Sequence, residues 1–140
     1  MKANFYLLKQ STPEARLMLA CRLAEQQARQ GQRICILTDT PEAAQEVDQL
    51  LWSYSPESFL PHALAGDAAA DKVAVVIAEG NAAPAGTTCI LNLGSEAPLN
   101  QSTLNAIAEF VLNDTESKAL SRTRWNLYKQ LGYELQHHQL

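Results

Sequence analysis

Glycine is absent from residues 9–13, the first connection that the sequence predicts between a strand and a helix. Dinucleotide fingerprints and P-loops both need glycine at this place, where the backbone approaches a phosphate. A Gly-x-Ser-x-Gly motif is also absent, which excludes a nucleophile elbow. No spacing of histidine, cysteine and aspartate suggests a zinc site. The sequence therefore shows no catalytic machinery, and we expect no cofactor and no metal.

Cysteine is scarce, and its three copies lie far apart inside apolar runs, at Cys21, Cys35 and Cys89. An odd number with this spacing favours reduced packing residues over a disulfide framework. The first eight residues carry one lysine and a short apolar run, too little for a signal peptide or a membrane span. We therefore expect a cytoplasmic protein.

An excess of basic residues is lacking as well. The formal net charge is -4. Proteins that bind the nucleic-acid backbone as their main activity usually present a basic footprint, so this balance argues against such an activity. Any role near DNA would then depend on protein partners.

The pattern of apolar runs within 140 residues predicts a single domain, residues 1–140. Strands are expected over residues 3–9, 33–38, 73–78 and 88–93. One helix should begin at Thr12-Pro13 and end at Gly31, and a second should run from Thr40-Pro41 to about Trp52. This alternation predicts an α/β fold with an open, mostly parallel sheet and helices on both faces. The fold would be Rossmann-like, without a nucleotide-binding loop.

The segment 104–112 fits either a helix or a strand, and we favour a strand over residues 107–112. A last helix should follow, because Asn113 and Glu116 have the spacing of a capping box and Gly132 is placed to end the helix. We expect residues 134–140 to form a frayed tail.

The last predicted helix has two faces. At about 100° per residue, Leu120, Leu127 and Leu131 fall together and are expected to face the core. The opposite side carries a set that we call the basic stripe, made of Lys118, Arg122, Trp125 and Lys129. A basic stripe is compatible with a solvated face. A tryptophan between cations equally suits a receptor for an acidic peptide with a bulky apolar terminus, and the residues alone favour neither interpretation.

Residues 52–62 bring together three aromatic residues, two prolines and a histidine. Prolines stiffen such a run, and stiff exposed aromatics often anchor protein interfaces. His62 and Asp39 are the candidates for chemistry inside the fold. We interpret His62 as structural because no orienting partner is identifiable, and Asp39 as a turn residue beside Thr40-Pro41.

Three motifs carry a family resemblance: Phe-Tyr-Leu-Leu near the N-terminus, Leu-Trp and then Pro-Glu-Ser-Phe-Leu-Pro-His at 56–62 followed by Leu-Ala-Gly, and a Lys-x3-Arg helix that ends in Gly-Tyr. With them the chain resembles the chi subunit family of bacterial DNA polymerase III over essentially its whole length. The resemblance implies a non-catalytic accessory subunit of the clamp-loader assembly in DNA replication. It also implies a Rossmann-like fold that binds no nucleotide.

The family implies two partners, the psi subunit and the acidic C-terminal tail of single-stranded-DNA-binding protein, so that association with single-stranded DNA would be indirect. By position, the psi surface would comprise Trp52, Phe59, Pro61 and Leu64. The tail surface would comprise Lys118, Arg122, Trp125 and Lys129. The position after Trp125 is often lysine in the family but is Asn126 here, so Lys129 or Arg124 would compensate or the affinity would be weaker.

Two alternatives remain open at this point. One is a small α/β nucleotide-binding enzyme or regulator that uses Asp39 or His62. The other is direct binding of single-stranded DNA along the basic stripe.

Overall fold

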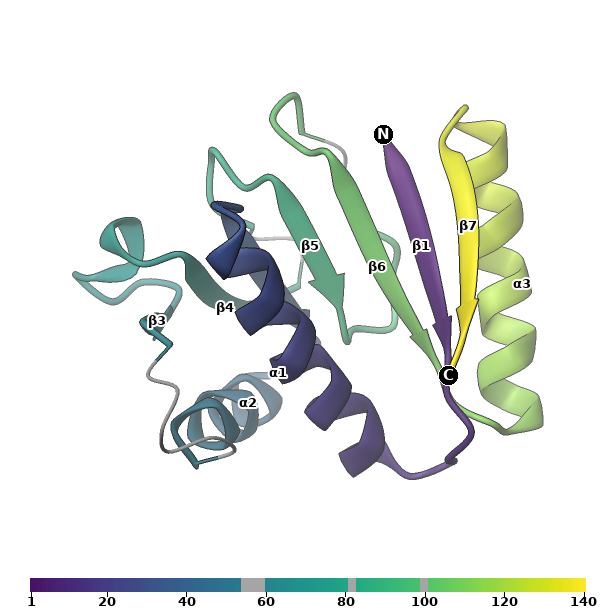
Figure 1. The fold of residues 1–140 in the computed structure, drawn as a ribbon, viewed down its shortest axis with the longest axis horizontal. Coiled ribbons are helices and arrows are strands. Elements are labelled where there is room, and N and C mark those ends of the chain that lie inside the picture. The colour runs from purple at the N-terminus through teal and green to yellow at the C-terminus, as the bar shows by residue number, and fades with distance from the viewer. Residues whose placement is uncertain (54–59, 81–82, 99–100) are drawn as a thin grey trace.

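The computed structural model of the 140-residue chain describes residues 1–53, 60–80, 83–98 and 101–140. Its sheet has seven strands in the order β3-β4-β2-β5-β6-β1-β7, and all pairs are parallel (Figure 1). The strands are β1 (Lys2–Leu7), β2 (Ile34–Thr38), β3 (His62–Leu64), β4 (Val75–Glu79), β5 (Cys89–Asn92), β6 (Ala106–Val111) and β7 (Glu134–Gln139). The predicted α/β fold with an open parallel sheet is confirmed.

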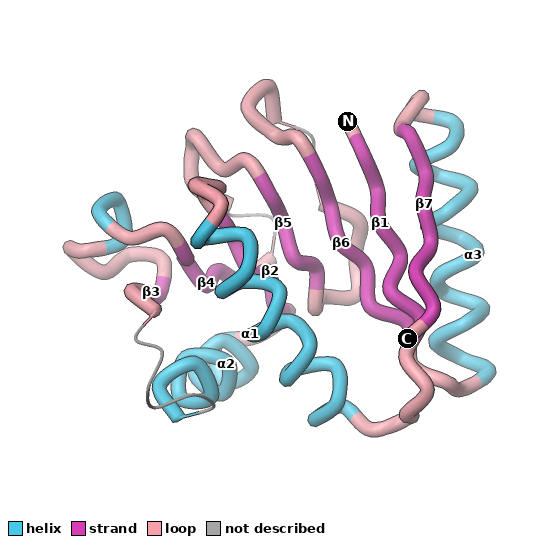
Figure 2. The backbone as a smooth tube through the Cα atoms, viewed as in Figure 1, coloured by secondary structure: helices cyan, strands magenta, loops and turns pink. Residues whose placement is uncertain are grey.

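Helices cover both faces of this sheet, as the sequence predicted (Figure 2). The elements are α1 (Pro13–Arg29), α2 (Pro41–Ser53) and α3 (Thr115–Gln130), with a short 3-10 turn, η1 (Ala70–Lys72). Buried residues of α1 and α2 pack against one face, whereas Tyr128 and Trp125 of α3 pack against the other. Within the described residues, no helix is both long and apolar enough to cross a membrane.

Local signals place the first two helices correctly. Pro13 occupies the first turn of α1 after Thr12, and Gly31 follows the helix with a φ of 84°, a conformation that glycine adopts without strain. At the start of α2, the Ala43 N–H donates to Thr40 Oγ1 at 3.1 Å. Both predicted starts are therefore confirmed, and α2 ends at Ser53, beside its predicted end.

The ambiguous segment is the strand β6, so the strand interpretation is confirmed. It lies between β5 and β1 in the sheet, with Ile107 opposite both Ile90 and Ala3. Ile107 has no exposed surface, which explains why the segment carries an apolar run long enough to imitate a helix.

The prediction of a frayed tail at residues 134–140 is wrong. Residues 134–139 form β7, which pairs with β1 from Lys2↔Glu134 to Leu7↔Gln139. The His138 ring stacks on Tyr6 with 4.8 Å between ring centroids. The strand carries few apolar residues because it lies at the sheet edge, and main-chain hydrogen bonds to β1 hold it in place. This is why no apolar run marks it in the sequence.

The three cysteines give a first testable prediction. Cys21, Cys35 and Cys89 are buried, and burial raises the pKa of the first two thiols to about 12 and of the third to about 11. At pH 8 the reactive thiolate is therefore rare, and a thiol-reactive disulfide reagent should label none of them in the folded protein. In denaturant all three should react. Rapid labelling without denaturant would contradict the buried, reduced assignment.

Candidate functional site

The N-cap of α3 lies one residue after the predicted one. Asp114, not Asn113, is the N-cap: the Ser117 N–H donates to Asp114 Oδ1 at 2.7 Å and Ser117 Oγ donates to Oδ2 at 3.0 Å. These hydrogen bonds, that from the backbone first, lower the pKa of the Asp114 carboxyl. Asn113 instead donates from Nδ2 to the Lys9 carbonyl at 3.1 Å, which ties the start of α3 to the end of β1. The predicted end at Gly132 is correct.

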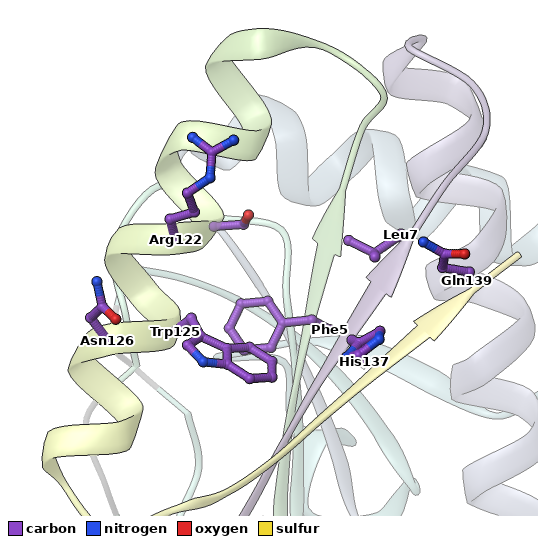
Figure 3. A pocket seen from close by; sticks show the side chains of 8 residues that line it. Phe5, Leu7, Arg122, Trp125, Asn126, His137 and Gln139 are labelled. Carbon is purple, nitrogen blue, oxygen red and sulfur yellow. The ribbon is translucent and has the colours of Figure 1, made fainter.

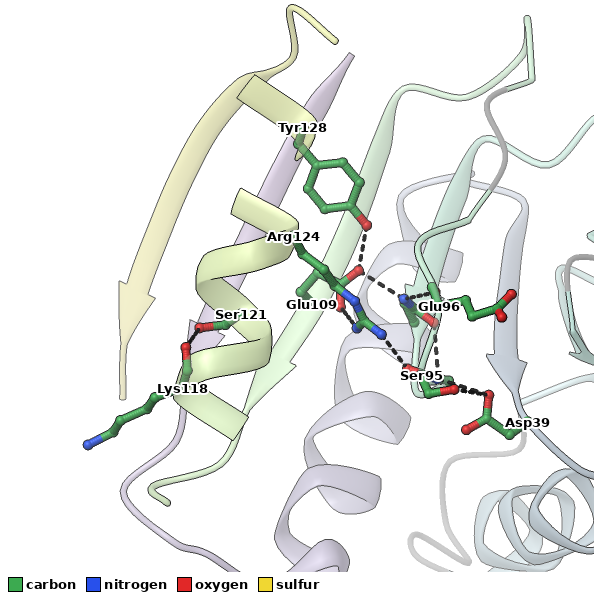
Figure 4. A network of polar contacts seen from close by, with 10 residues as sticks. Asp39, Ser95, Glu96, Glu109, Lys118, Ser121, Arg124 and Tyr128 are labelled. Carbon is green, nitrogen blue, oxygen red and sulfur yellow. Dashed lines mark hydrogen bonds and ion pairs between the residues drawn. The ribbon is translucent and has the colours of Figure 1, made fainter. Parts of the chain in front are cut away.

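The predicted core side of α3 is wrong. Exposed fractions are 44% for Leu120, 40% for Leu127 and 57% for Leu131, whereas Arg124 and Tyr128 are buried. Both buried side chains point at Glu109 of β6 (Figure 4). Arg124 Nη1 donates to Glu109 Oε1 at 2.5 Å, and the Tyr128 hydroxyl donates to Oε2 at 2.6 Å. A buried carboxylate needs such donors, so they take the core positions in place of leucines.

Further hydrogen bonds connect this cluster to the end of β5 and to the loop that follows it (Figure 4). Asn92 Nδ2 donates to Glu109 Oε2 at 2.9 Å, and Arg124 Nη2 donates to the Gly94 carbonyl at 3.1 Å. Burial raises the pKa of the Glu109 carboxyl, against the opposing effects of the Arg124 charge and the donated hydrogen bonds. Burial and the neighbouring Glu109 charge raise the pKa of Tyr128. This network sets the rotation of α3 about its axis.

That rotation turns Trp125 toward the sheet, where its ring lies 5.2 Å from the Phe5 ring between centroids. Beside the two rings is a cavity of about 480 Å³ between α3 and the strands β1 and β7, which we call the α3 pocket (Figure 3). Its lining comprises Phe5, Leu7, Ser121, Arg122, Trp125, Asn126, His137 and Gln139. The pocket thus has an aromatic interior and one permanent cation, Arg122.

The members of the basic stripe have different surroundings. Arg122 and Trp125 line the α3 pocket, and Lys118 lines an adjoining cavity of about 290 Å³. Lys129 is exposed and lines neither cavity. Arg124 is held by Glu109, so it is not available to compensate for Asn126.

Sequence reasoning missed the sheet side of the α3 pocket. Phe5 and Leu7 lie two residues apart in β1 and so face the same side, a signal that was present in the sequence. Their register partners in β7 are His137 and Gln139. Those two residues gave no signal, because β7 itself has no apolar run.

The aromatic run lies at the other edge of the sheet. Trp52 at the end of α2 is 56% exposed, and its ring lies 4.6 Å from the His62 ring between centroids. Pro61 is exposed and Leu64 in β3 is partly exposed, while Phe59 lies outside the described residues. Since β3 and β7 are the two edge strands, five to six strand spacings, or about 24–29 Å along the sheet, separate this surface from the α3 pocket.

The two residues considered for chemistry have structural contacts. Asp39 Oδ1 accepts hydrogen bonds from the Ser95 N–H at 2.9 Å and from Ser95 Oγ at 3.2 Å. His62 Nδ1 lies 2.7 Å from the Leu60 carbonyl oxygen and Nε2 lies 3.3 Å from Asp48 Oδ1. Among the described residues, no group of three or more histidine, cysteine, aspartate or glutamate side chains could hold a metal ion. These contacts support the structural interpretation of both residues.

Comparison with known proteins agrees with the motifs. The family model described as "DNA polymerase III chi subunit, HolC" matches residues 1–136. The DNA polymerase III subunit chi of Pseudomonas aeruginosa is 34% identical over 141 residues, which cover 99% of this chain and 96% of that protein. The subunit chi of Escherichia coli is 30% identical over 138 residues, with 95% and 94% covered. The chain therefore belongs to the DNA polymerase III chi subunit family and is a non-catalytic accessory subunit in DNA replication.

Proposed function

We propose that this subunit bridges two partners in the replication assembly, the psi subunit and the acidic C-terminal tail of single-stranded-DNA-binding protein. The observation that carries the proposal is the α3 pocket, which combines aromatic walls with a cation on the face opposite to α1 and α2. The exposed aromatic surface at the far edge of the sheet supports a second, separate partner site.

The α3 pocket suits the end of an acidic peptide. An apolar or aromatic terminal side chain would pack in the pocket against Trp125 beside Phe5, where a ring gains from both burial and ring contact. The terminal carboxylate would accept hydrogen bonds from the guanidinium of Arg122, a strong charge-assisted pair. Lys118 lies one helical turn before Arg122, where it would attract the acidic residues that precede the terminal residue of the peptide. Lys129 lies beyond the pocket and would contribute less.

Two substitutions test the tail-binding site. Arg122→Ala and Lys118→Glu should each weaken binding of a peptide that ends in acidic residues and a C-terminal phenylalanine. Each lost charge-assisted contact is worth on the order of 1–3 kcal/mol. Titration calorimetry measures the affinities, and added salt should weaken the wild-type complex because exposed charges are screened.

Lys72→Ala in η1 is the matched control, since Lys72 is exposed and lies outside α3 and β1. Its affinity for the peptide should equal that of the wild type. Equal affinities for the wild type, Arg122→Ala and Lys118→Glu would refute the tail-binding site. A pull-down with single-stranded DNA and no partner protein should recover none of the subunit if its association with DNA is indirect.

The proposed psi surface comprises Trp52, Pro61 and Leu64. Phe59 is included because of its position in the family motif. Exposed tryptophans in a fixed orientation are frequent hot spots of protein interfaces. Here the Trp52 ring is held against the buried His62 ring, so little side-chain freedom remains to be lost on binding. This contact would be mainly apolar and therefore far less sensitive to salt than the tail contact.

A further inference from the structure

We infer that Lys9 is a further specificity residue for the acidic peptide. Lys9 and Lys118 flank a cavity that receives an acidic side chain a few residues before the C-terminal end of the peptide. The inference rests on the proposed tail-binding function of the α3 pocket. The cavity has a volume of about 290 Å³ and contains both lysines in its lining. No family motif in the sequence points to Lys9.

The two cavities adjoin each other along α3. Leu7 and Gln139, which are register partners in β1 and β7, line both of them. A peptide whose last residue lies in the α3 pocket can therefore continue into the second cavity while it contacts the same strand pair. Leucine and valine residues form much of the wall of the second cavity. The cationic residues in this wall are Lys9 and Lys118.

The backbone on both sides of this second cavity is fixed. The Lys9 carbonyl accepts from Asn113 Nδ2 at 3.1 Å, and the preceding Leu8 N–H donates to the Val111 carbonyl at 2.9 Å. Lys118 lies in the first turn of α3, and Asp114 is the N-cap of this helix. The two lysines thus approach the second cavity from different elements, one from the end of β1 and one from the helix.

The charge of the second cavity complements an acidic ligand. Within the described parts of the chain, neither Lys9 nor Lys118 forms an ion pair. The nearby carboxylate of Asp114 accepts hydrogen bonds from the Ser117 N–H and hydroxyl, so its orientation is set by the helix cap. An acidic side chain from a partner would therefore meet two cations with no ion pair to break, although the Asp114 carboxylate already interacts electrostatically with Lys118.

Spacing along α3 gives the register and the direction of the peptide. Lys118 and Arg122 are four residues apart, about 6 Å along the helix axis. An extended peptide rises about 3.3 Å per residue, so this distance corresponds to about two residues, and the reach of a lysine side chain extends the range to about four. The peptide would enter from the N-terminal end of α3 and finish at Arg122 and Trp125. In this direction Lys129 makes no contact with it.

The experiment compares two synthetic peptides that end in phenylalanine, one with aspartates at the third and fourth positions before the end and one with asparagines there. Lys9→Gln should weaken binding of the aspartate peptide roughly two- to fivefold at low salt, as expected for an exposed ion pair. It should leave the affinity for the asparagine peptide unchanged. Lys72→Gln is the matched lysine control and should alter neither affinity. Titration calorimetry on the intact protein gives all the values, and a double-mutant cycle isolates the coupling.

The outcomes separate this inference from the proposed function. If Arg122→Ala weakens binding of the aspartate peptide while Lys9→Gln does not, the role of Lys9 is refuted and the proposed tail-binding site is retained. Equal weakening of both peptides by Lys9→Gln also refutes a specific contact with the acids. If Lys129→Gln weakens binding of the aspartate peptide and Lys9→Gln does not, the peptide runs in the opposite direction and the role of Lys9 is refuted. If the wild-type protein binds neither peptide, the proposed tail function itself fails.

Discussion

Arg124→Ala should lower the free energy of unfolding by about 3–5 kcal/mol, because it leaves the Glu109 carboxylate buried without its cation. Glu109 is 3% exposed and Arg124 is 8% exposed, so the pair is shielded from bulk water. Tyr128 and Asn92 would still donate to Glu109 Oε2, but neither carries a charge. Urea unfolding followed by far-ultraviolet circular dichroism measures the change.

Arg122→Ala on the same helix is the matched control, since Arg122 is exposed and its loss should change stability by no more than about 0.5 kcal/mol. A double variant, Glu109→Leu with Arg124→Met, removes both charges and should recover part of the lost stability; recovery is incomplete because the buried Tyr128 hydroxyl loses its acceptor. If Arg124→Ala were no more destabilising than Arg122→Ala, the ion pair would not be what anchors α3 to the sheet.

Trp52→Ala should abolish co-purification with the psi subunit, with a loss of affinity of about 30-fold or more, which corresponds to at least about 2 kcal/mol. Trp52 offers the largest exposed aromatic surface in the described part of the chain, and its ring is already oriented by His62. Truncation to alanine removes that anchor without touching the buried residues of α2. A pull-down and a titration with purified psi measure the effect.

Two controls accompany this variant. Trp52→Ala should bind the acidic peptide as the wild type does, because the α3 pocket lies at the opposite edge of the sheet. Leu131→Ala removes another large exposed side chain, 57% exposed after α3, and should leave psi binding intact. Equal loss of psi and peptide binding in Trp52→Ala would count against two separate sites.

Features that depend on neighbours in the chain were predictable from the sequence. The proline starts of α1 and α2 and the glycine stops after α1 and α3 are local, since each depends on the conformations of a few adjacent residues. The central strands were predictable as well, because burial on both faces produces continuous apolar runs.

Features that depend on distant partners were not predictable in this way. The inward face of α3 is chosen by Glu109, a residue of another element, which draws Arg124 and Tyr128 toward the core and leaves Leu127 outside. The pattern of apolar residues does not reveal which face of α3 is buried. In the sequence, a buried polar residue whose hydrogen bonds are satisfied cannot be told from a surface residue.

The proposed binding residues show the same division between local and distant signals. The sequence identified Lys118, Arg122 and Trp125, which lie close together in one helix. It did not identify the opposite wall, because His137 and Gln139 belong to a strand recognisable only by its pairing with β1. The proposed role of Lys9 likewise follows from the junction of β1 with α3 and not from any local motif.

The pairing of β1 with β7 also affects the order in which the molecule becomes complete. Lys2 lies opposite Glu134, so β1 leaves the ribosome well before the strand with which it pairs. Contacts between such distant segments form slowly, and chains fold from the N-terminal side while they are made. A nascent chain that has just completed α3 already carries Lys118, Arg122 and Trp125, yet it has no pocket. The α3 pocket therefore forms only after β7 has been made and has paired with β1.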